Sequence, residues 1–295
     1  MIENLNDGSQ RAPRLRRDIN WGTLLELPLW SSVPKAEGLE LMLAIKEAGY
    51  EGVQGGKPEL CREAGLASTG SFRTSEPGVV DTLVKDRKEK GYEALSTHVG
   101  WGMESDALID AYVNEVLAAS QKYNIPVFIE THRATMCQDI WRTVEMVNRH
   151  PDIRFNGDFS HWYTGLEMPY GSIEEKLNFL EPVFQRTRFF HGRIGDSCNI
   201  QTSFKEDEEN VATFKEMWTR SMVGFLTQSK PGDVLPFNPE LLPPSMSYAR
   251  TFLDHRGEMR EECDRWEQAL LMSDIAEGCF EEALKRVEEP LLINR

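Results

Sequence analysis

The sequence predicts a closed barrel of eight parallel strands surrounded by helices, a (β/α)8 or TIM barrel, with a C-terminal helical extension. The first observation is that eight short strand-like segments are mostly separated by amphipathic helical segments, a pattern typical of parallel α/β folds. The second is length, because 295 residues accommodate one barrel of about 250 residues with terminal extensions. The third is the absence of a GxGxxG or P-loop motif, which disfavours a nucleotide-binding open sheet.

Strands are expected where short apolar or β-branched runs end in glycine or polar residues. Residues 1–18 are polar and are expected to form a loose arm before the first strand, Gly22–Leu29. The other seven strands are expected at Glu51–Gly55, Gly65–Phe72, Ala94–His98, Pro126–Thr131, Ile153–Asp158, Arg188–Ile194 and Asp233–Glu240.

Helices are expected where apolar residues recur three or four positions apart and glycine or proline marks an end. They are expected at Ala36–Gly49, Pro77–Gly91, Ser105–Tyr123, Gln138–Arg149, Ser172–Phe184 and Asp207–Thr227. Residues 257–295 follow the eighth strand and are expected to form one or two acidic helices that pack on the barrel floor or on a subunit partner. The predicted organisation is thus an arm (1–18), a barrel (19–256) and an extension (257–295).

The composition excludes several classes of partner. A formal net charge of −15 argues against nucleic acids and anionic membranes, since both call for surfaces rich in lysine and arginine. The chain has no apolar run of about 18 residues, so no membrane span is predicted, and the N-terminus lacks a signal-peptide core. Five cysteines without a CxxC pair are typical of reduced thiols, so we expect a cytoplasmic protein, with homo-oligomers left open.

Ligand-type side chains stand at the ends of four expected strands, at Glu130, Asp158, His191 and Glu240. The carboxyl ends of barrel strands share one mouth, so these residues are expected to converge on a divalent ion. An oxygen-rich set favours Mn2+, with Mg2+, Co2+ and Zn2+ as alternatives. Each residue alone has a structural alternative: Glu130 as an ion-pair partner of Arg133, His191 as a core histidine, and Asp158 and Glu240 as caps.

Four segments resemble the xylose-isomerase-like barrel superfamily of sugar phosphate isomerases and epimerases. They are VFIETHR (127–133), GDFSHW (157–162), FFHGRIGD (189–196) and NPELLPPSMSYAR (238–250). The resemblance covers about Ile19–Arg256 and is strongest from Val127 to Tyr248. It implies that Glu130, Asp158, His191 and Glu240 hold the metal, and that His98, His161 and Arg193 contact the substrate.

The parts predict a reaction class. A dication bound to a carbonyl and its neighbouring hydroxyl acidifies the adjacent C–H, and a carboxylate such as Glu130 or Glu240 then removes the proton to give an enediolate. Arg133, His161 and Arg193 would hold substrate oxygens. We therefore expect a metal-dependent isomerase or epimerase acting on a small sugar or keto-sugar.

Two other functions remain open from the sequence. A lyase or dehydratase acting on a keto-sugar or inosose would use the same base and lose a β-substituent instead. A non-catalytic barrel that binds a sugar or a partner subunit is supported only by the C-terminal extension. A DNA-repair nuclease is disfavoured, because such members of the superfamily gather three zinc ions with many histidines, and this chain has six.

Overall fold

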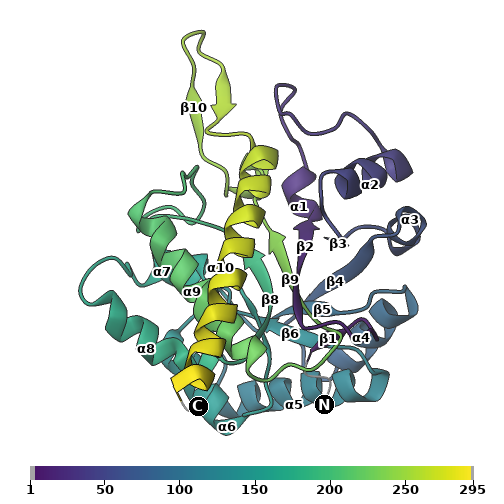
Figure 1. Ribbon diagram of the computed structural model, residues 1–295, viewed down its shortest axis with the longest axis vertical. Coiled ribbons are helices and arrows are strands. Elements are labelled where there is room, and N and C mark those ends of the chain that lie inside the picture. Colours follow the sequence, from purple (N-terminus) through teal and green to yellow (C-terminus); the bar gives the residue numbers. More distant parts are fainter. Residues whose placement is uncertain (1–3, 294–295) are drawn as a thin grey trace.

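The computed structural model describes residues 4–293, and within this range eight parallel strands close into a barrel (Figure 1). The barrel strands are β2 (Arg14–Asn20), β3 (Gly52–Gln54), β4 (Ala67–Thr74), β5 (Leu95–Val99), β6 (Val127–Glu130), β7 (Phe155–Gly157), β8 (Thr187–Gly192) and β9 (Asp233–Pro239). Strand β9 pairs in parallel with both β8 and β2, which closes the ring. The predicted (β/α)8 fold class is confirmed.

The helices lie outside the barrel and follow capping signals in the sequence. Helix α5 starts after Ser105, whose side chain accepts a hydrogen bond from the backbone N–H of Leu108, and it ends at Asn124 in the left-handed conformation. The helices are α1 (Trp21–Leu24), α2 (Gly38–Glu47), α3 (Pro58–Ala64), α4 (Val80–Glu89), α5 (Asp106–Tyr123), α6 (Ile140–Arg149), α7 (Ser160–Gly165), α8 (Ile173–Phe184), α9 (Glu209–Leu226) and α10 (Arg265–Ile293), with a 3-10 turn η1 (Pro244–Met246).

The prediction for the first strand was wrong. The apolar run Gly22–Leu29 does not form a strand: the short helix α1 occupies its start, capped by the side chain of Asn20. The first barrel strand, β2, lies instead in and just after the expected loose arm. Its inward-facing charges are buried because Arg16 donates two hydrogen bonds of 2.7 Å to the carboxylate of Asp18. Paired charges thus replace the apolar residues by which a barrel strand is usually recognised.

The expected position of the C-terminal segment also needs correction. Helix α10 lies along the barrel wall, where it packs against α9 and contacts β9, α1 and β2 (Figure 1). It therefore covers the outside of the last and first strands, rather than the floor, as the outer helix that follows the eighth strand. Its buried face includes Trp266, Ala269, Met272 and Ile275.

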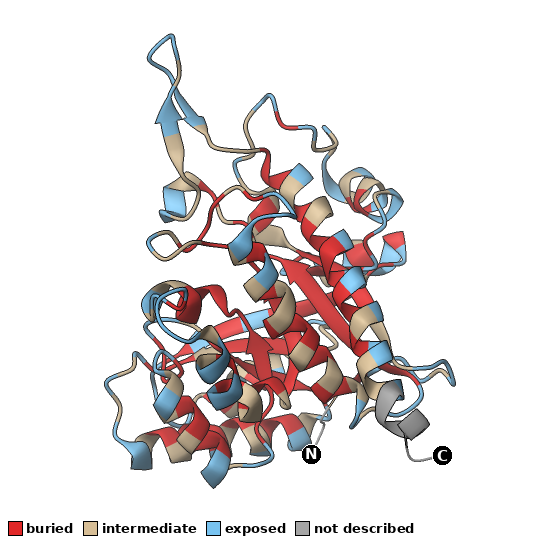
Figure 2. Cartoon of the chain, turned by 60° about the vertical axis from the view of Figure 1, so that its left-hand side comes forward, coloured by how far each residue is buried: buried red, intermediate tan, exposed pale blue. Residues whose placement is uncertain are grey.

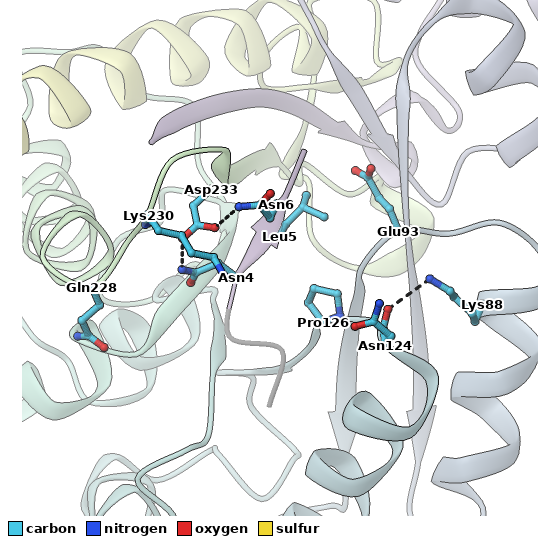
Figure 3. A pocket seen from close by; sticks show the side chains of 10 residues that line it. All are labelled: Asn4, Leu5, Asn6, Lys88, Glu93, Asn124, Pro126, Gln228, Lys230 and Asp233. Carbon is cyan, nitrogen blue, oxygen red and sulfur yellow. Dashed lines mark hydrogen bonds between the residues drawn. The ribbon is translucent and has the colours of Figure 1, made fainter. Parts of the chain in front are cut away.

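The floor of the barrel is closed by the N-terminal segment. Leu5 of β1 (Leu5–Asn6) joins a buried apolar cluster with Ala94, Phe128, Phe189 and Val234. Asn4 and Asn6 donate hydrogen bonds of 2.6 and 2.7 Å to the carboxylate of Asp233, which fixes β1 beside β9 (Figure 3). A hollow of about 480 Å³ opens beside this segment, at the end of the barrel opposite to the strand tips.

Burial follows the layers of the fold. Figure 2 shows the barrel strands mostly buried, whereas exposed residues lie mainly on the outer faces of the helices, on the loops and on the hairpin that follows the barrel. A hairpin of β10 (Thr251–Leu253) and β11 (Met259–Glu261) projects away from the barrel (Figures 1 and 2). None of the helices within residues 4–293 combines the length and the apolar character that a membrane span requires.

Candidate metal and substrate site

Four side chains that are far apart in the sequence meet at the mouth of the barrel. Glu130 is the last residue of β6, Asp158 and Glu240 directly follow β7 and β9, and His191 lies near the end of β8. Each offers one ligand-type atom, and these four atoms lie within 4.8 Å of one another. Side chains on adjacent strands thus converge as the sequence predicted, because all the strands run parallel and present their carboxyl ends to the same side.

Glu130 lies at the centre of this cluster. One carboxylate oxygen, Oε2, accepts hydrogen bonds from Ser96 at 3.0 Å and from Asn156 at 3.1 Å, and it lies 3.2 Å from Nδ1 of His191. The other oxygen, Oε1, lies 2.9 Å from Nε2 of His98, although the two atoms are not aligned for a hydrogen bond. Glu130 is thus fixed from below by Ser96 and Asn156, with both oxygens facing imidazoles.

The two carboxylate oxygens of Asp158 make different contacts: one binds the start of the next helix, and the other faces the cluster. Oδ1 accepts hydrogen bonds from the backbone N–H and the hydroxyl of Ser160, at 3.2 and 2.5 Å, at the start of α7. Oδ2 lies 3.3 Å from Nε of Arg193 and 3.3 Å from Nε2 of His161. The residue therefore orders the turn into α7 and also presents an oxygen to the cluster.

Glu240 is the most accessible member of the cluster. Its side chain is 14% exposed, against 2–3% for Glu130 and His191. Oε1 accepts a hydrogen bond of 2.9 Å from Asn20, and Oε2 is bound by Nη2 of Arg193. Its carboxylate is thus held by two donors at the edge of a cavity, where a ligand can reach it.

The charges of the cluster determine one another's pKa values. Burial alone would raise the pKa of Glu130, but His191 and His98 outweigh burial and hold it well below its usual value. For His191, burial lowers the pKa, whereas Glu130 and Glu240 raise it to about 9. The pKa of Asp158 is raised by burial and lowered more strongly by Arg193 and His161. The carboxylates of Glu130 and Asp158 are therefore ionised, and the raised pKa of His191 shows that the carboxylates around it favour a positive charge at its position.

The donor set and its spacing fit a divalent ion. Oε1 of Glu130 and Nδ1 of His191 are buried and have no hydrogen-bond partner within residues 4–293, although buried polar atoms are normally bonded. Ligands about 2.2 Å from one ion lie at most about 4.4 Å apart. The four ligand-type atoms would therefore have to move by only a few tenths of an ångström to bind one ion. Three carboxylates and one imidazole could thus hold a metal here.

Gln54 of β3 orients the histidine of the cluster. Nε2 of His191 lies 2.6 Å from Oε1 of Gln54, which also accepts a hydrogen bond of 2.8 Å from Asn20. When the ring is neutral, as it would be on a metal ion, this contact would keep the proton on Nε2 and leave the lone pair of Nδ1 facing Glu130 and Glu240. Gln54 was not among the residues expected from the sequence.

Replacing Gln54 by leucine should weaken metal binding without removing a ligand. Loss of the hydrogen bond frees the ring of His191, and changes of this kind typically cost about 10- to 100-fold in metal affinity. The check is titration of the metal-free protein with Mn2+ by calorimetry. Gln121→Leu, on the exposed face of α5, is the matched control, and equal affinities of the two variants would contradict the role of Gln54.

Three histidine rings contact one another in tilted arrangements beside the cluster. The ring of His132 lies 4.3 Å from that of His98 and 3.7 Å from that of His161, measured between centroids. Burial and then His161 lower the pKa of His132 to about 3, so this ring is neutral. His98, Glu130 and His132 form a second group whose ligand atoms lie within 4.8 Å of one another. Glu130 is thus shared between two groups that could each hold a cation.

A cavity of about 180 Å³ opens next to the cluster. It is lined by Asn20, Gln54, Ser71, Phe72, Arg73, Ser96, His98, Glu130, His191 and Glu240. Hydroxyl, amide and charged groups predominate, and such a lining suits a small polyhydroxylated molecule better than an apolar one.

The structure brings the four expected substrate-binding residues to different places. His98 lines the cavity. His161 and Arg193 are 3% and 1% exposed and lie behind it, on Asp158. Arg133 is exposed, and its guanidinium carbon lies 5.3 Å from the ring centroid of Tyr248.

Four residues at the site were not expected there from the sequence: Asn20, Gln54, Arg73 and Tyr248. Arg73 stands near the end of β4, where its position at a strand tip was a usable signal. Tyr248 lies within the quoted segment 238–250, with its ring 4.3 Å from the guanidinium carbon of Arg193 and its hydroxyl 3.4 Å from Nε2 of His132. It thus connects the loop after β9 with the three histidine rings.

Comparison with known proteins gives similarities of fold. No family model and no curated protein sequence matches the chain significantly. Similar solved structures include a sugar phosphate isomerase/epimerase from Parabacteroides distasonis, with 12% identity, a TM-score of 0.49, and coverage of 88% of this chain and 96% of that one. The probable 3-DHS dehydratase AsbF from Bacillus anthracis has 13% identity, a TM-score of 0.48, and coverage of 88% and 97%.

Endonuclease IV from Thermus thermophilus is similar over 79% of this chain and 95% of its own, with 13% identity and a TM-score of 0.44. At identities this low, the resemblances concern the arrangement of strands and helices. The activities in these names belong to those proteins.

Proposed function

We propose that this protein is a divalent-metal-dependent sugar isomerase or epimerase that removes a proton next to a carbonyl. The observation that carries the proposal is the convergence of Glu130, Asp158, His191 and Glu240 within 4.8 Å at the barrel mouth, beside a polar cavity. The resemblance of the four sequence segments to xylose-isomerase-like barrels supports the same reaction class. The acidic charge of −15 weighs against a nucleic-acid substrate.

The proposed ion is Mn2+, bound by three carboxylates and one imidazole, a set rich in the oxygen ligands that Mn2+ favours. When bound, such an ion acts as a Lewis acid that polarises the substrate carbonyl and acidifies the neighbouring C–H. Mg2+, Co2+ and Zn2+ remain alternatives, since each accepts carboxylate or imidazole ligands.

Glu130 and Glu240 are the proposed acid–base pair, and their surroundings favour Glu240 as the group that first takes the proton. Glu240 borders the cavity and is partly exposed, whereas Glu130 is buried and held by Ser96 and Asn156. Asn20 and Arg193 fix the Glu240 carboxylate, so it needs little reorganisation to meet a substrate C–H. Return of the proton to the adjacent carbon gives isomerisation, and return to the opposite face of the same carbon gives epimerisation.

His98 is proposed to bind a substrate oxygen from the cavity wall, since it lines the cavity and contacts Glu130. Arg133, at the rim beside Tyr248, is proposed to meet a more distant oxygen. His161 and Arg193 contact Asp158, and Arg193 also contacts Glu240. We propose that they act on the substrate indirectly, by holding Asp158 and Glu240 in position.

The test combines metal analysis with proton exchange. The purified protein is dialysed against Mn2+, its metal content is measured, and it is then incubated in D2O with aldoses, ketoses and inososes. We expect one tightly held ion per chain and deuterium at the carbon next to the carbonyl, detected by NMR. A product with enone absorbance would identify the lyase alternative. A metal-loaded protein that exchanges no proton with any of these compounds would favour a non-catalytic barrel.

A further inference from the structure

Arg73 lies across the barrel mouth from the metal cluster. It stands on β4, and in the closed order β2 to β9 this strand is four steps from β8, which carries His191, in either direction. Both residues line the same cavity. A ligand that contacts the cluster with one end therefore presents its other end to the rim where Arg73 stands.

Arg73 is held in place but has no acidic partner among the described residues. Its guanidinium carbon lies 3.9 Å from the ring centroid of Trp101, and Nη2 donates a hydrogen bond of 2.5 Å to the carbonyl of Ala134. Within residues 4–293, no carboxylate lies within 4.0 Å of its guanidinium nitrogens, although the chain has 48 acidic residues. An arginine has five N–H donors, so several remain for a ligand.

A second guanidinium without a carboxylate partner lies at the same rim. Arg133 directly precedes Ala134, the residue that binds Arg73, and it stacks on Tyr248 with no ion pair in the described part of the chain. Stacking on aromatic rings fixes both guanidinium groups at little entropic cost. Besides its carboxylates, the mouth thus has two guanidinium groups that lie on aromatic rings and make no ion pair within the described residues.

We infer that this rim is a carboxylate subsite, and that the substrate is an acidic sugar of the hexuronate class. This inference rests on the proposed function, in which the carbonyl end of the sugar lies at the cluster. A planar guanidinium matches a carboxylate in two parallel hydrogen bonds. A single negative charge also suits this mouth better than the double charge of a phosphate ester, because Glu130, Asp158 and Glu240 repel the second charge.

The experiment measures binding of matched pairs of sugars that differ in one group. Mn2+-loaded protein is titrated by calorimetry with D-glucose and D-glucuronate, D-mannose and D-mannuronate, and D-galactose and D-galacturonate, and with D-glucose 6-phosphate. We expect at least one uronate to bind about 10- to 100-fold more tightly than its neutral partner, the range expected for hydrogen bonds to a charged group. The phosphate ester should bind more weakly than that uronate.

The variant Arg73→Gln should remove most of this preference, and Arg73→Lys should keep part of it. Arg62→Gln, an exposed change on α3 that removes the same charge, is the matched control and should keep it in full. Arg73 also joins the loops of Trp101 and Ala134. If this structural role were its only one, Arg73→Gln would lower the affinities for acidic and neutral sugars by the same factor. The ratio of the affinities for a uronate and its neutral partner therefore distinguishes carboxylate binding from a structural role.

Failure of the subsite and failure of the proposed reaction give different results. Equal binding of uronates and neutral sugars, stronger binding of the phosphate ester, or an unchanged ratio in Arg73→Gln would each overturn the subsite, even if proton exchange occurs. Absence of binding by every sugar would also overturn it. Absence of metal and of exchange, with an Arg73-dependent preference for a uronate, would overturn the reaction and leave the subsite supported.

Discussion

The variant Glu240→Gln is expected to lose proton exchange by about 10³-fold, within the usual 10²–10⁴ range for removal of a general base. Glutamine keeps the shape and can still accept from Asn20, but its amide nitrogen meets the donating Nη2 of Arg193. The new group can neither take a proton nor offer the ion a negative charge. The measurement is deuterium incorporation from D2O under saturating Mn2+, with the thermal unfolding midpoint recorded in parallel.

Glu26→Gln is the matched control for this variant. Glu26 is an exposed carboxylate that follows α1 on the mouth side of the barrel, and it is not part of the cluster. Its replacement removes the same charge and should leave exchange nearly unchanged. If Glu240→Gln exchanged protons as fast as Glu26→Gln, another group would have to be the base. A fall in metal content alone would assign Glu240 a binding role.

The four cluster residues could be predicted because each signal is local. Glu130, Asp158, His191 and Glu240 each interrupt an apolar strand at its carboxyl end, and the parallel barrel brings all such ends together. No pairing between distant residues had to be known. The fold class followed for the same reason, from alternation that is visible within short windows of sequence.

The residues that were missed depend on contacts between distant parts of the chain. Strand β2 reads as polar, because the sequence does not show that Arg16 and Asp18 neutralise each other inside the barrel. Placing that strand too late also hid Asn20, which reaches Glu240 only because β2 adjoins β9. Hydropathy is assigned to each residue separately, whereas the burial of Arg16 and Asp18 and the position of Asn20 depend on the partner that each one contacts.

The ion-pair partners of Arg193 also could not be identified from the sequence. Asp196 is the carboxylate nearest to Arg193 in sequence, but the guanidinium lies on Asp158 and Glu240, which follow two other strands. Asp196 instead accepts hydrogen bonds from its own loop, from the backbone N–H groups of Cys198 and Asn199. Sequence proximity therefore does not identify the partner of Arg193, since ion pairs between parallel strands join residues tens of positions apart.

The variant Asp158→Asn is expected to lose the metal and to lower the free energy of unfolding by about 3 kcal/mol, as for one partner removed from a buried ion pair. Asp158 and Arg193 are both almost completely buried, so the change leaves a buried guanidinium with Glu240 as its remaining partner. The measurements are denaturant unfolding and metal content. In the double variant with Arg193→Met, stability should largely return because the buried guanidinium that lost one of its two carboxylate partners is gone, while the metal should remain absent.

The single variant Arg193→Met then separates the ion-pair role of Asp158 from its metal-binding role. Without an ion it leaves the Asp158 carboxylate buried beside His161, and stability should fall. With Mn2+ at about 100 times its dissociation constant, binding to the folded state should add about 2.7 kcal/mol, because the carboxylate has a new partner. Asp158→Asn should gain far less from the same addition. If Mn2+ raised the free energy of unfolding equally in the two variants, Asp158 would be only an ion-pair partner of Arg193. Any bound ion would then be held without Asp158.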